Sequence, residues 1–278
     1  MKVNLVAIVI LVFLITSCKN EQKSTDEKSQ EKQIKEEVQQ KFQNKGHELV
    51  HTMVKKVGDY SKFLNKEDVI YTYTYKTPDG KTDISTEKYM FNGELSYGAY
   101  ETHERTLSNL EGFMEQGYDG NEYWLKIDGT IIKDEASLEK VAFNRPTNFY
   151  WFAMMPKLLD PGLRYEYLGE EVMDEPKFDV VKVSFESKDD KPKDIYQVYI
   201  NKETQLVDQF LFTVMDYGKT EPFLMKVEYE NVEGLLIPTK RKYKASNWDA
   251  EATDEEWTLV NWTDIKFNNG LTKADFKQ

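Results

Sequence analysis

Two histidines spaced around a glutamate form the one pattern in this chain that matches a catalytic motif letter for letter. Residues 46–53 are GHELVHTM, in which His47, Glu48 and His51 fit the zinc-protease pattern H-E-x-x-H. On a helix, side chains four residues apart share a face, so two imidazoles can bind one Zn²⁺ while the glutamate activates a bound water. The pattern raises the hypothesis of a zinc-dependent hydrolase.

A zinc site of this type needs a third protein ligand, and the sequence offers none in a familiar place. In the longer pattern H-E-x-x-H-x-x-G-x-x-H, this chain has Val54 where the glycine belongs and lacks the third histidine. His103 falls in a predicted strand, and Glu67 precedes a strand instead of lying on a second helix. We therefore interpret His47 and His51 as surface or capping residues of a helix, and we expect no catalytic residue, no metal and no cofactor. A zinc hydrolase is the enzymatic alternative.

Composition and the remaining motifs favour a binding protein over an enzyme. The chain has 49 acidic and 37 basic residues and a net charge of −12. Such an acidic surface argues against nucleic acid, which requires a basic footprint. A glycosidase would need two carboxylates at a set separation, which no spacing in the sequence fixes. No G-x-S-x-G, Walker or G-x-G-x-x-G motif supports a nucleophile elbow or a nucleotide site.

The N-terminus is typical of a secretory signal followed by a lipid attachment site. It reads MKVNLVAIVILVFLITSCKN, with Lys2 before an apolar run that is too short to span a bilayer. The stretch ITSC at 15–18 resembles the lipobox of bacterial lipoproteins, and that resemblance implies cleavage before Cys18 and acyl chains on it. The residue after the cysteine is Lys19 and not aspartate, so the sequence lacks the inner-membrane retention signal. We expect residues 1–17 to be the signal peptide and the outer membrane, on its periplasmic or its surface face, to be the location.

The residues after the cysteine indicate a tether and then one domain. Residues 19–33, KNEQKSTDEKSQEKQ, contain no apolar side chain, so ordering them would gain no buried surface. We expect 18–33 to be the lipidated cysteine with a flexible tether, and 34–278 to form a single domain in a monomeric protein. The domain would be held to the membrane by the lipid anchor.

Apolar periodicity predicts a mostly β domain with few helices. Aromatic residues make up 13% of the chain, with 17 tyrosines, which favours strands. Helical spacing predicts a helix over 34–57, divided at Gly46, and one or two short helices over 136–159, interrupted by Pro146 and Pro156. Alternating runs separated by Asn-Gly and Asp-Gly turns predict antiparallel strands. The strands are expected at 69–76, 85–91, 95–104, 112–118, 122–127, 164–169, 178–187, 195–200, 206–214, 224–230, 235–244 and 257–267.

This order of elements resembles the LolA/LolB-type lipoprotein-carrier fold. Stretches that carry the resemblance are YDGNEYW at 118–124, YINKETQLV at 199–207 and GLLIP at 234–238. Residues 155–162 and 265–276 are similar to uncharacterised lipoproteins of the same superfamily. The resemblance covers roughly residues 35 to 278 and implies an α+β, mostly β fold. It would be a curved, incomplete antiparallel barrel of about 11 strands, closed by short helices.

The same resemblance implies a cavity between the sheet and the helices that holds a hydrophobic or lipid-like ligand. The densest apolar stretch after the signal is the natural candidate for its lining, although it could equally be plain core. Aromatic and methionine side chains adapt to flexible apolar ligands. The candidate ligand-binding residues are Phe149, Tyr150, Trp151, Phe152, Met154, Met155, Tyr71 and Tyr73. We expect an envelope lipoprotein that handles lipids or lipoproteins; a structural, interaction or sensor lipoprotein without a ligand is the alternative.

Overall fold

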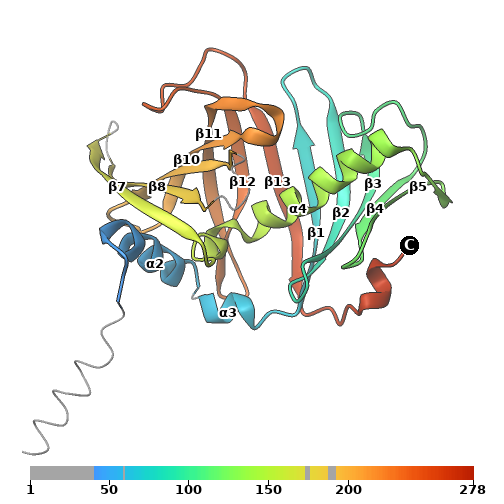
Figure 1. Ribbon diagram of the computed structural model, residues 1–278, viewed down its shortest axis with the longest axis horizontal. Helices are drawn as coiled ribbons and strands as arrows, with labels where there is room; N and C mark the ends of the chain where they lie inside the picture. The colour runs from blue at the N-terminus through green and yellow to red at the C-terminus, as the bar shows by residue number, and fades with distance from the viewer. Residues whose placement is uncertain (1–40, 59, 173–175, 187–191) are drawn as a thin grey trace, which may run out of the picture. The chain divides into compact units, whose positions relative to one another are not determined.

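All the strands that the structure describes belong to one antiparallel sheet. The computed structural model (Figure 1) describes residues 41–58, 60–172, 176–186 and 192–278. The 13 strands follow the order β6-β5-β4-β3-β2-β1-β13-β12-β11-β10-β9-β8-β7. Neighbours in the sheet are neighbours in sequence except at the β1–β13 pair, where the two ends of the domain meet. The sheet is not closed: β6 and β7 remain its two edges, as in an incomplete barrel.

The strand bounds agree closely with the predicted ranges, and the mostly β fold class is confirmed. The resemblance implied about 11 strands, and the twelve predicted ranges each match one observed strand; the one described strand without a predicted range is the two-residue β6, which is too short to show alternation. The strands are β1 (Asp68–Lys76), β2 (Thr82–Met90), β3 (Leu95–His103), β4 (Met114–Tyr118), β5 (Tyr123–Ile127), β6 (Thr130–Ile131), β7 (Leu163–Val172), β8 (Lys177–Phe185), β9 (Ile195–Asn201), β10 (Val207–Val214), β11 (Lys219–Val232), β12 (Leu235–Ala245) and β13 (Thr258–Phe267).

The alternation in β1 explains which face of the sheet becomes the core. Tyr71, Tyr73 and Tyr75 are buried, whereas the threonines between them are only half-buried. Successive side chains of a strand point to opposite faces, so the three rings line one face. Tyr71 stacks on Phe152 with ring centroids 4.8 Å apart. This inner face is therefore the face that packs against helix.

The helices are α2 (Lys45–Val57), α3 (Tyr60–Leu64) and α4 (Glu135–Lys157), with short 3₁₀ turns η1 (Met215–Tyr217) and η2 (Lys273–Phe276). Of the predicted helix over 34–57, the part before residue 41 lies outside the described residues. α2 begins at Lys45 because the Asn44 side chain caps it, accepting a hydrogen bond of 3.1 Å from the His47 N–H. Its apolar face packs on β7, β8 and β12. Among the described residues, no helix has the length and apolarity needed to cross a membrane.

α4 is the element that the sequence predicted least well. It is one helix of 23 residues with Pro146 and Pro156 inside it, so the prediction of short, interrupted helices is wrong. It joins the two edges of the sheet and crosses its inner face (Figure 1). An interior proline costs about 3 kcal/mol. Burial on either side of Pro146, at Arg145, Phe149 and Phe152, keeps the helix continuous despite that cost.

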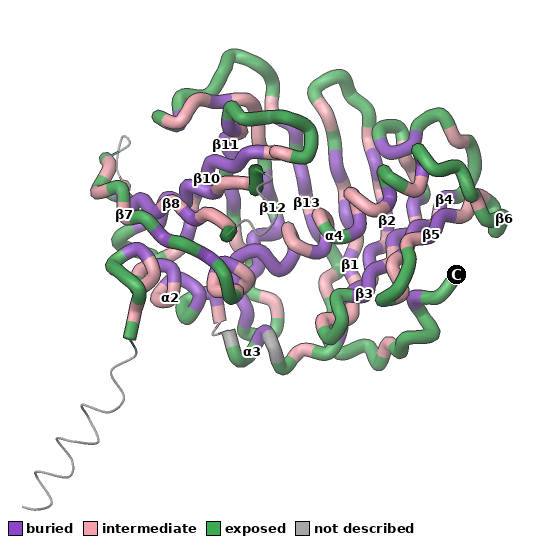
Figure 2. The backbone as a smooth tube through the Cα atoms, viewed as in Figure 1, coloured by how far each residue is buried: buried purple, intermediate pink, exposed green. Residues whose placement is uncertain are grey.

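Three core clusters along α4 fix its path over the sheet. Val141 packs with residues of β3, β4 and β5, and Phe149, Phe152 and Ala153 pack with β1, β12 and β13. Met154 and Met155 pack with α2 and β7–β11. Figure 2 shows the buried central strands with the exposed loops at their ends. One helix thus contacts both halves of the sheet.

A buried ion pair attaches α4 to the sheet. Arg145 donates to both carboxylate oxygens of Glu87 on β2, at 2.9 and 3.3 Å, and both side chains are fully buried. Tyr89 and Ser85 donate further hydrogen bonds of 2.7 Å to the same carboxylate, and Tyr100 accepts one from Arg145. A Cβ at Gly98 would lie 2.5 Å from the Arg145 guanidinium, so glycine makes room for the pair.

Removing one partner of this pair should strongly destabilise the fold. We expect Arg145→Met to lower the free energy of unfolding by about 3–5 kcal/mol, because it leaves the Glu87 carboxylate buried without a counter-charge. The control is Arg164→Met, which breaks an exposed pair with Glu186 and should cost less than about 1 kcal/mol. Urea unfolding measures both. An Arg145→Met variant no less stable than the control would contradict this account.

Candidate ligand-binding pocket

A large hollow lies between α4 and the inner face of the sheet. It has a volume of about 560 Å³ and opens to solvent, which falls in the range of small-molecule sites. One side is formed by α4, and the other by β1, β9, β10, β11 and β12 with their loops. Its lining comprises Tyr73, Tyr75, Arg105, Ala142, Phe143, Asn144, Pro146, Thr147, Asn148, Tyr150, Trp151, Phe185, Lys193, Asp194, Tyr196, Phe212, Thr213, Val214, Asp216, Tyr217, Lys219, Phe223 and Tyr243.

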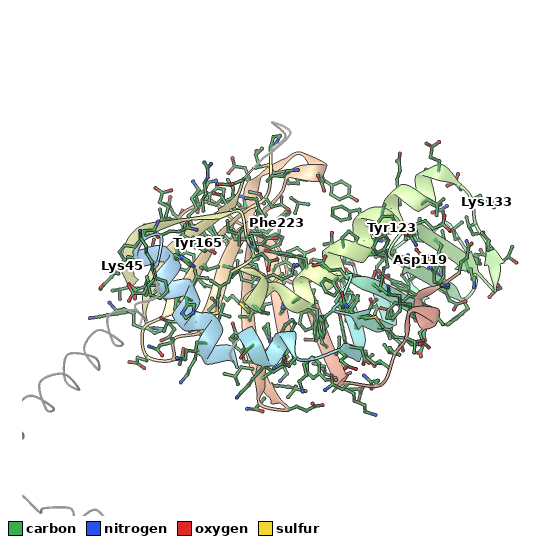
Figure 3. The ribbon with its side chains drawn as sticks, turned by 60° about the horizontal axis from the view of Figure 1, so that its bottom comes forward. Lys45, Asp119, Tyr123, Lys133, Tyr165 and Phe223 are labelled. Carbon is green, nitrogen blue, oxygen red and sulfur yellow. The ribbon has the colours of Figure 1, made fainter. Side chains whose placement is uncertain are left out.

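Aromatic rings make up the inner wall of the pocket. The Trp151 ring meets Phe212 edge-on at 5.7 Å and Tyr243 at 6.1 Å between centroids. Phe223, on β11, lies 5.7 Å from Tyr243 (Figure 3). Tyr75 and Tyr243 share a hydrogen bond between their hydroxyls. Rings from α4 and from four strands thus interlock into a largely aromatic wall.

The mouth of the pocket is polar and is bridged by two rings. Phe143 on α4 and Tyr217 on η1 meet edge-on at 4.7 Å, and Tyr217 is exposed. Asp194 accepts hydrogen bonds from the Met215 N–H at 2.7 Å and from Thr213 at 3.4 Å. Burial raises the pKa of Asp194 above its usual value. The pocket therefore combines an apolar interior with a polar entrance.

A proline removes a backbone donor on the helix side of the pocket. Pro146 has no N–H, so the carbonyl of Ala142, four residues earlier, lacks the donor that a regular helix would supply. Both residues line the pocket. The residue that breaks the helical hydrogen-bond pattern therefore lies where a ligand or water can replace the missing bond.

The structure distributes the sequence-derived candidates between the pocket and the core. Tyr73, Tyr150 and Trp151 line the pocket. The others lie in the core, where Phe149, Phe152 and Tyr71 pack in the cluster around β1 and β13, and Met154 and Met155 pack in the cluster around α2. Phe152 and Met155 also border a second hollow of about 20 Å³, which has room for little more than a water molecule.

Most of the strand side of the pocket was missed from the sequence. Tyr196, Phe212, Phe223 and Tyr243 all line it. Tyr196, Phe212 and Tyr243 lie within predicted strands, and Phe223 lies one residue before the predicted range 224–230. Alternation along a strand separates its two faces but does not single out these residues. Which inward-facing rings border a void depends on the path of α4, which no local pattern specifies.

The two histidines of the H-E-x-x-H pattern do share the helix α2, one turn apart. The His47 ring stacks on Tyr165 of β7 at 4.7 Å with an interplanar angle of 9°, and Figure 3 shows Tyr165 beside α2. Its Nδ1 accepts a hydrogen bond from the Gln43 N–H at 3.2 Å. Burial lowers the pKa of His47, and the nearby His51 adds to the shift. Among the described residues, no three His, Cys, Asp or Glu side chains gather closely enough to hold a metal ion.

The described chain forms an open antiparallel sheet with one long helix across its inner face, and the sheet and the helix enclose an aromatic pocket. No protein-family model matches the chain, and no curated protein matches it. Among solved structures it is similar to a LolA superfamily protein from Nitrosomonas europaea, with 11% identity and a TM-score of 0.49 over 84% of this chain and 97% of that one. The resemblance predicted from the sequence is to the same superfamily.

Two further solved structures are similar at the same level. A putative outer membrane lipoprotein-sorting protein domain from Vibrio parahaemolyticus is 14% identical, with a TM-score of 0.48, covering 84% of this chain and 96% of that one. A DUF1329 family protein from Desulfovibrio piger is 13% identical, with a TM-score of 0.49, covering 84% and 97%.

The role of His47 can be tested by removing its ring. We expect His47→Ala to lower the free energy of unfolding by about 1 kcal/mol through the lost stacking on Tyr165, and to leave the metal content unchanged. Glu48→Gln, at an exposed position of the same helix, is the control and should be neutral. Urea unfolding and elemental analysis measure the two effects. One equivalent of zinc in the parent protein, lost in His47→Ala, would contradict this interpretation.

Proposed function

We propose that this protein is a membrane-anchored envelope lipoprotein that binds a hydrophobic or lipid-like ligand in the pocket beneath α4. The observation that carries the proposal is the aromatic pocket of about 560 Å³. Soluble domains usually fill their cores to near-crystalline density. A large hollow walled by rings therefore favours a ligand that covers those rings.

The wall of the pocket suits a flexible chain better than a rigid polar molecule. Trp151, Phe212 and Tyr243 present ring faces and edges and few directional hydrogen-bond groups. Each methylene moved from water onto such a wall contributes about 0.8 kcal/mol. A chain of several methylenes would thus bind through the hydrophobic effect alone.

The lipid anchor at Cys18 is the second part of the proposal. Residues 1–40, which include the signal 1–17 and the whole tether 18–33, lie outside the described residues, so this part depends on the lipobox-like sequence. Several acyl chains on one residue would hold the domain stably at a membrane. The domain would then bind its ligand at the surface of the outer membrane, in lipid or lipoprotein handling, without a chemical step.

Binding can be measured with a neutral dye that fluoresces in apolar surroundings. We expect the full chain to bind such a dye saturably, and Trp151→Ala to weaken the binding by about tenfold, because a large part of the apolar contact is lost. Trp257→Ala is the matched control: it removes the same side chain from the cluster of Phe178 and Leu224, away from the pocket. Saturable binding that responds to Trp257→Ala and not to Trp151→Ala would place the ligand elsewhere and refute the proposal.

The anchor has its own test. We expect Cys18→Ser to release the protein from the membrane fraction of a Gram-negative host and to remove the added acyl mass, because the thiol is the only attachment point for the lipid. Lys19→Ser serves as the control and should stay in the membrane fraction. Fractionation and intact-mass analysis report the result. A Cys18→Ser protein that remains membrane-bound would contradict the anchor.

A further inference from the structure

A buried arginine stands behind the inner wall of the pocket. Arg241 on β12 is only 3% exposed. Its Nε donates to the Pro238 carbonyl at 3.0 Å, and its Nη2 donates to the Trp151 carbonyl of α4 at 2.8 Å. The guanidinium also lies over the Trp262 ring, 4.1 Å from its centroid. These contacts hold the cation in place but bring no negative charge to it.

Arg241 differs from the other buried arginine in lacking a counter-ion. Arg145 is paired with Glu87, whereas no carboxylate among the described residues forms an ion pair with Arg241. Its Nη1 has no hydrogen-bond partner in that part of the chain. Burying an unpaired charge is costly, and here burial lowers the pKa of Arg241 to about 10. The Arg241 guanidinium therefore has no anionic partner among the described residues.

The residues around Arg241 connect it to the pocket. Tyr243, two residues along β12 and hence on the same face, lines the pocket. So does Trp151, whose carbonyl accepts from Arg241. Tyr73 and Tyr196, also in the lining, are close enough to act electrostatically on the guanidinium. The unpaired Nη1 therefore belongs to a cation directly behind the inner wall of the pocket.

We propose that the pocket takes an amphiphile with an acidic head group, and that Arg241 is the cation that binds this head group. The inference rests on the proposed function and names its ligand class. A guanidinium matches the planar geometry of carboxylates and binds phosphates equally well. The head group lies inward, and the acyl chain lies along Trp151 and Phe212 toward the mouth. Nη1 is buried in this structure, so the ligand reaches it only when side chains of the inner wall move aside.

The test compares three ligands with the same chain: dodecanoic acid, dodecyl phosphate and dodecanol. Each displaces the neutral dye from the full chain, at low salt and at about 1 M salt. We expect at least one of the two acids to bind about tenfold or more tightly than the alcohol, as for a hydrogen bond to a charged group. The preference should persist at high salt, because a buried contact is weakly screened. The acid with the larger preference identifies the head group as carboxylate or phosphate.

Two variants separate Arg241 from the cations at the mouth. We expect Arg241→Met to bring the acids and the alcohol to similar affinities, and Lys219→Met, at the exposed rim, to leave the preference intact. If Arg241→Met fails to fold, the salt series on the parent protein decides. A preference that vanishes at high salt or in Lys219→Met, or equal affinities in the parent protein, would overturn the role of Arg241. If none of the three ligands displaces the dye, the proposed function itself fails.

Discussion

The ion pair between Arg145 and Glu87 is the contact on which the rest of the structure depends. Both side chains are fully buried, and the carboxylate also accepts hydrogen bonds from Ser85 and Tyr89. A buried pair of this kind adds little net stability, but it penalises every arrangement in which its partners are apart. It therefore fixes the position of α4 along β2 and β3. Gly98 is the sequence feature that makes the close approach possible.

Once α4 is attached at Arg145, the pocket follows from geometry. The helix crosses the sheet from β5 to β7, and only part of its length is in close contact with the strands below. Phe149 and Phe152 pack in the core, while Tyr150 and Trp151, which lie between them in the sequence, line the pocket. Pro146, about one turn earlier in the helix, also lines the pocket. The two buried arginines thus have different roles: Arg145 forms an ion pair with Glu87 and positions the helix, whereas Arg241 forms no ion pair among the described residues and its Nη1 has no hydrogen-bond partner there.

The sequence predicted the strands well because their signals are local. Tyr71, Tyr73 and Tyr75 alternate with threonines, and the Asp-Gly and Asn-Gly turns separate neighbouring strands. It predicted α4 poorly, because Pro146 and Pro156 favour a break locally, and only tertiary burial of Arg145 and Phe149 offsets that preference. Only a small part of the pocket lining was predicted, for the same reason. Tyr150 and Trp151 stood out as a cluster, whereas Phe212 and Tyr243 resemble every other inward-facing residue of a strand.

The H-E-x-x-H pattern illustrates the opposite case: the sequence matches a catalytic motif, but among the described residues the fold brings no third ligand to the two histidines. His47 and His51 share a helix as the pattern requires, yet His47 stacks on Tyr165 and accepts a backbone hydrogen bond. The Arg145–Glu87 pair, by contrast, spans 58 residues and has no motif in the sequence. Contacts that join distant strands and helices are set by the whole fold, so short-range patterns do not report them.

Native mass spectrometry of the full chain, purified from the membranes of a Gram-negative host, tests the central claim most directly. The account predicts a species with one bound amphiphile per chain, which denaturation releases and which Trp151→Ala depletes. A protein that carries only its covalent mass, and gains none after incubation with a total lipid extract, would contradict the claim that the pocket beneath α4 is a binding site.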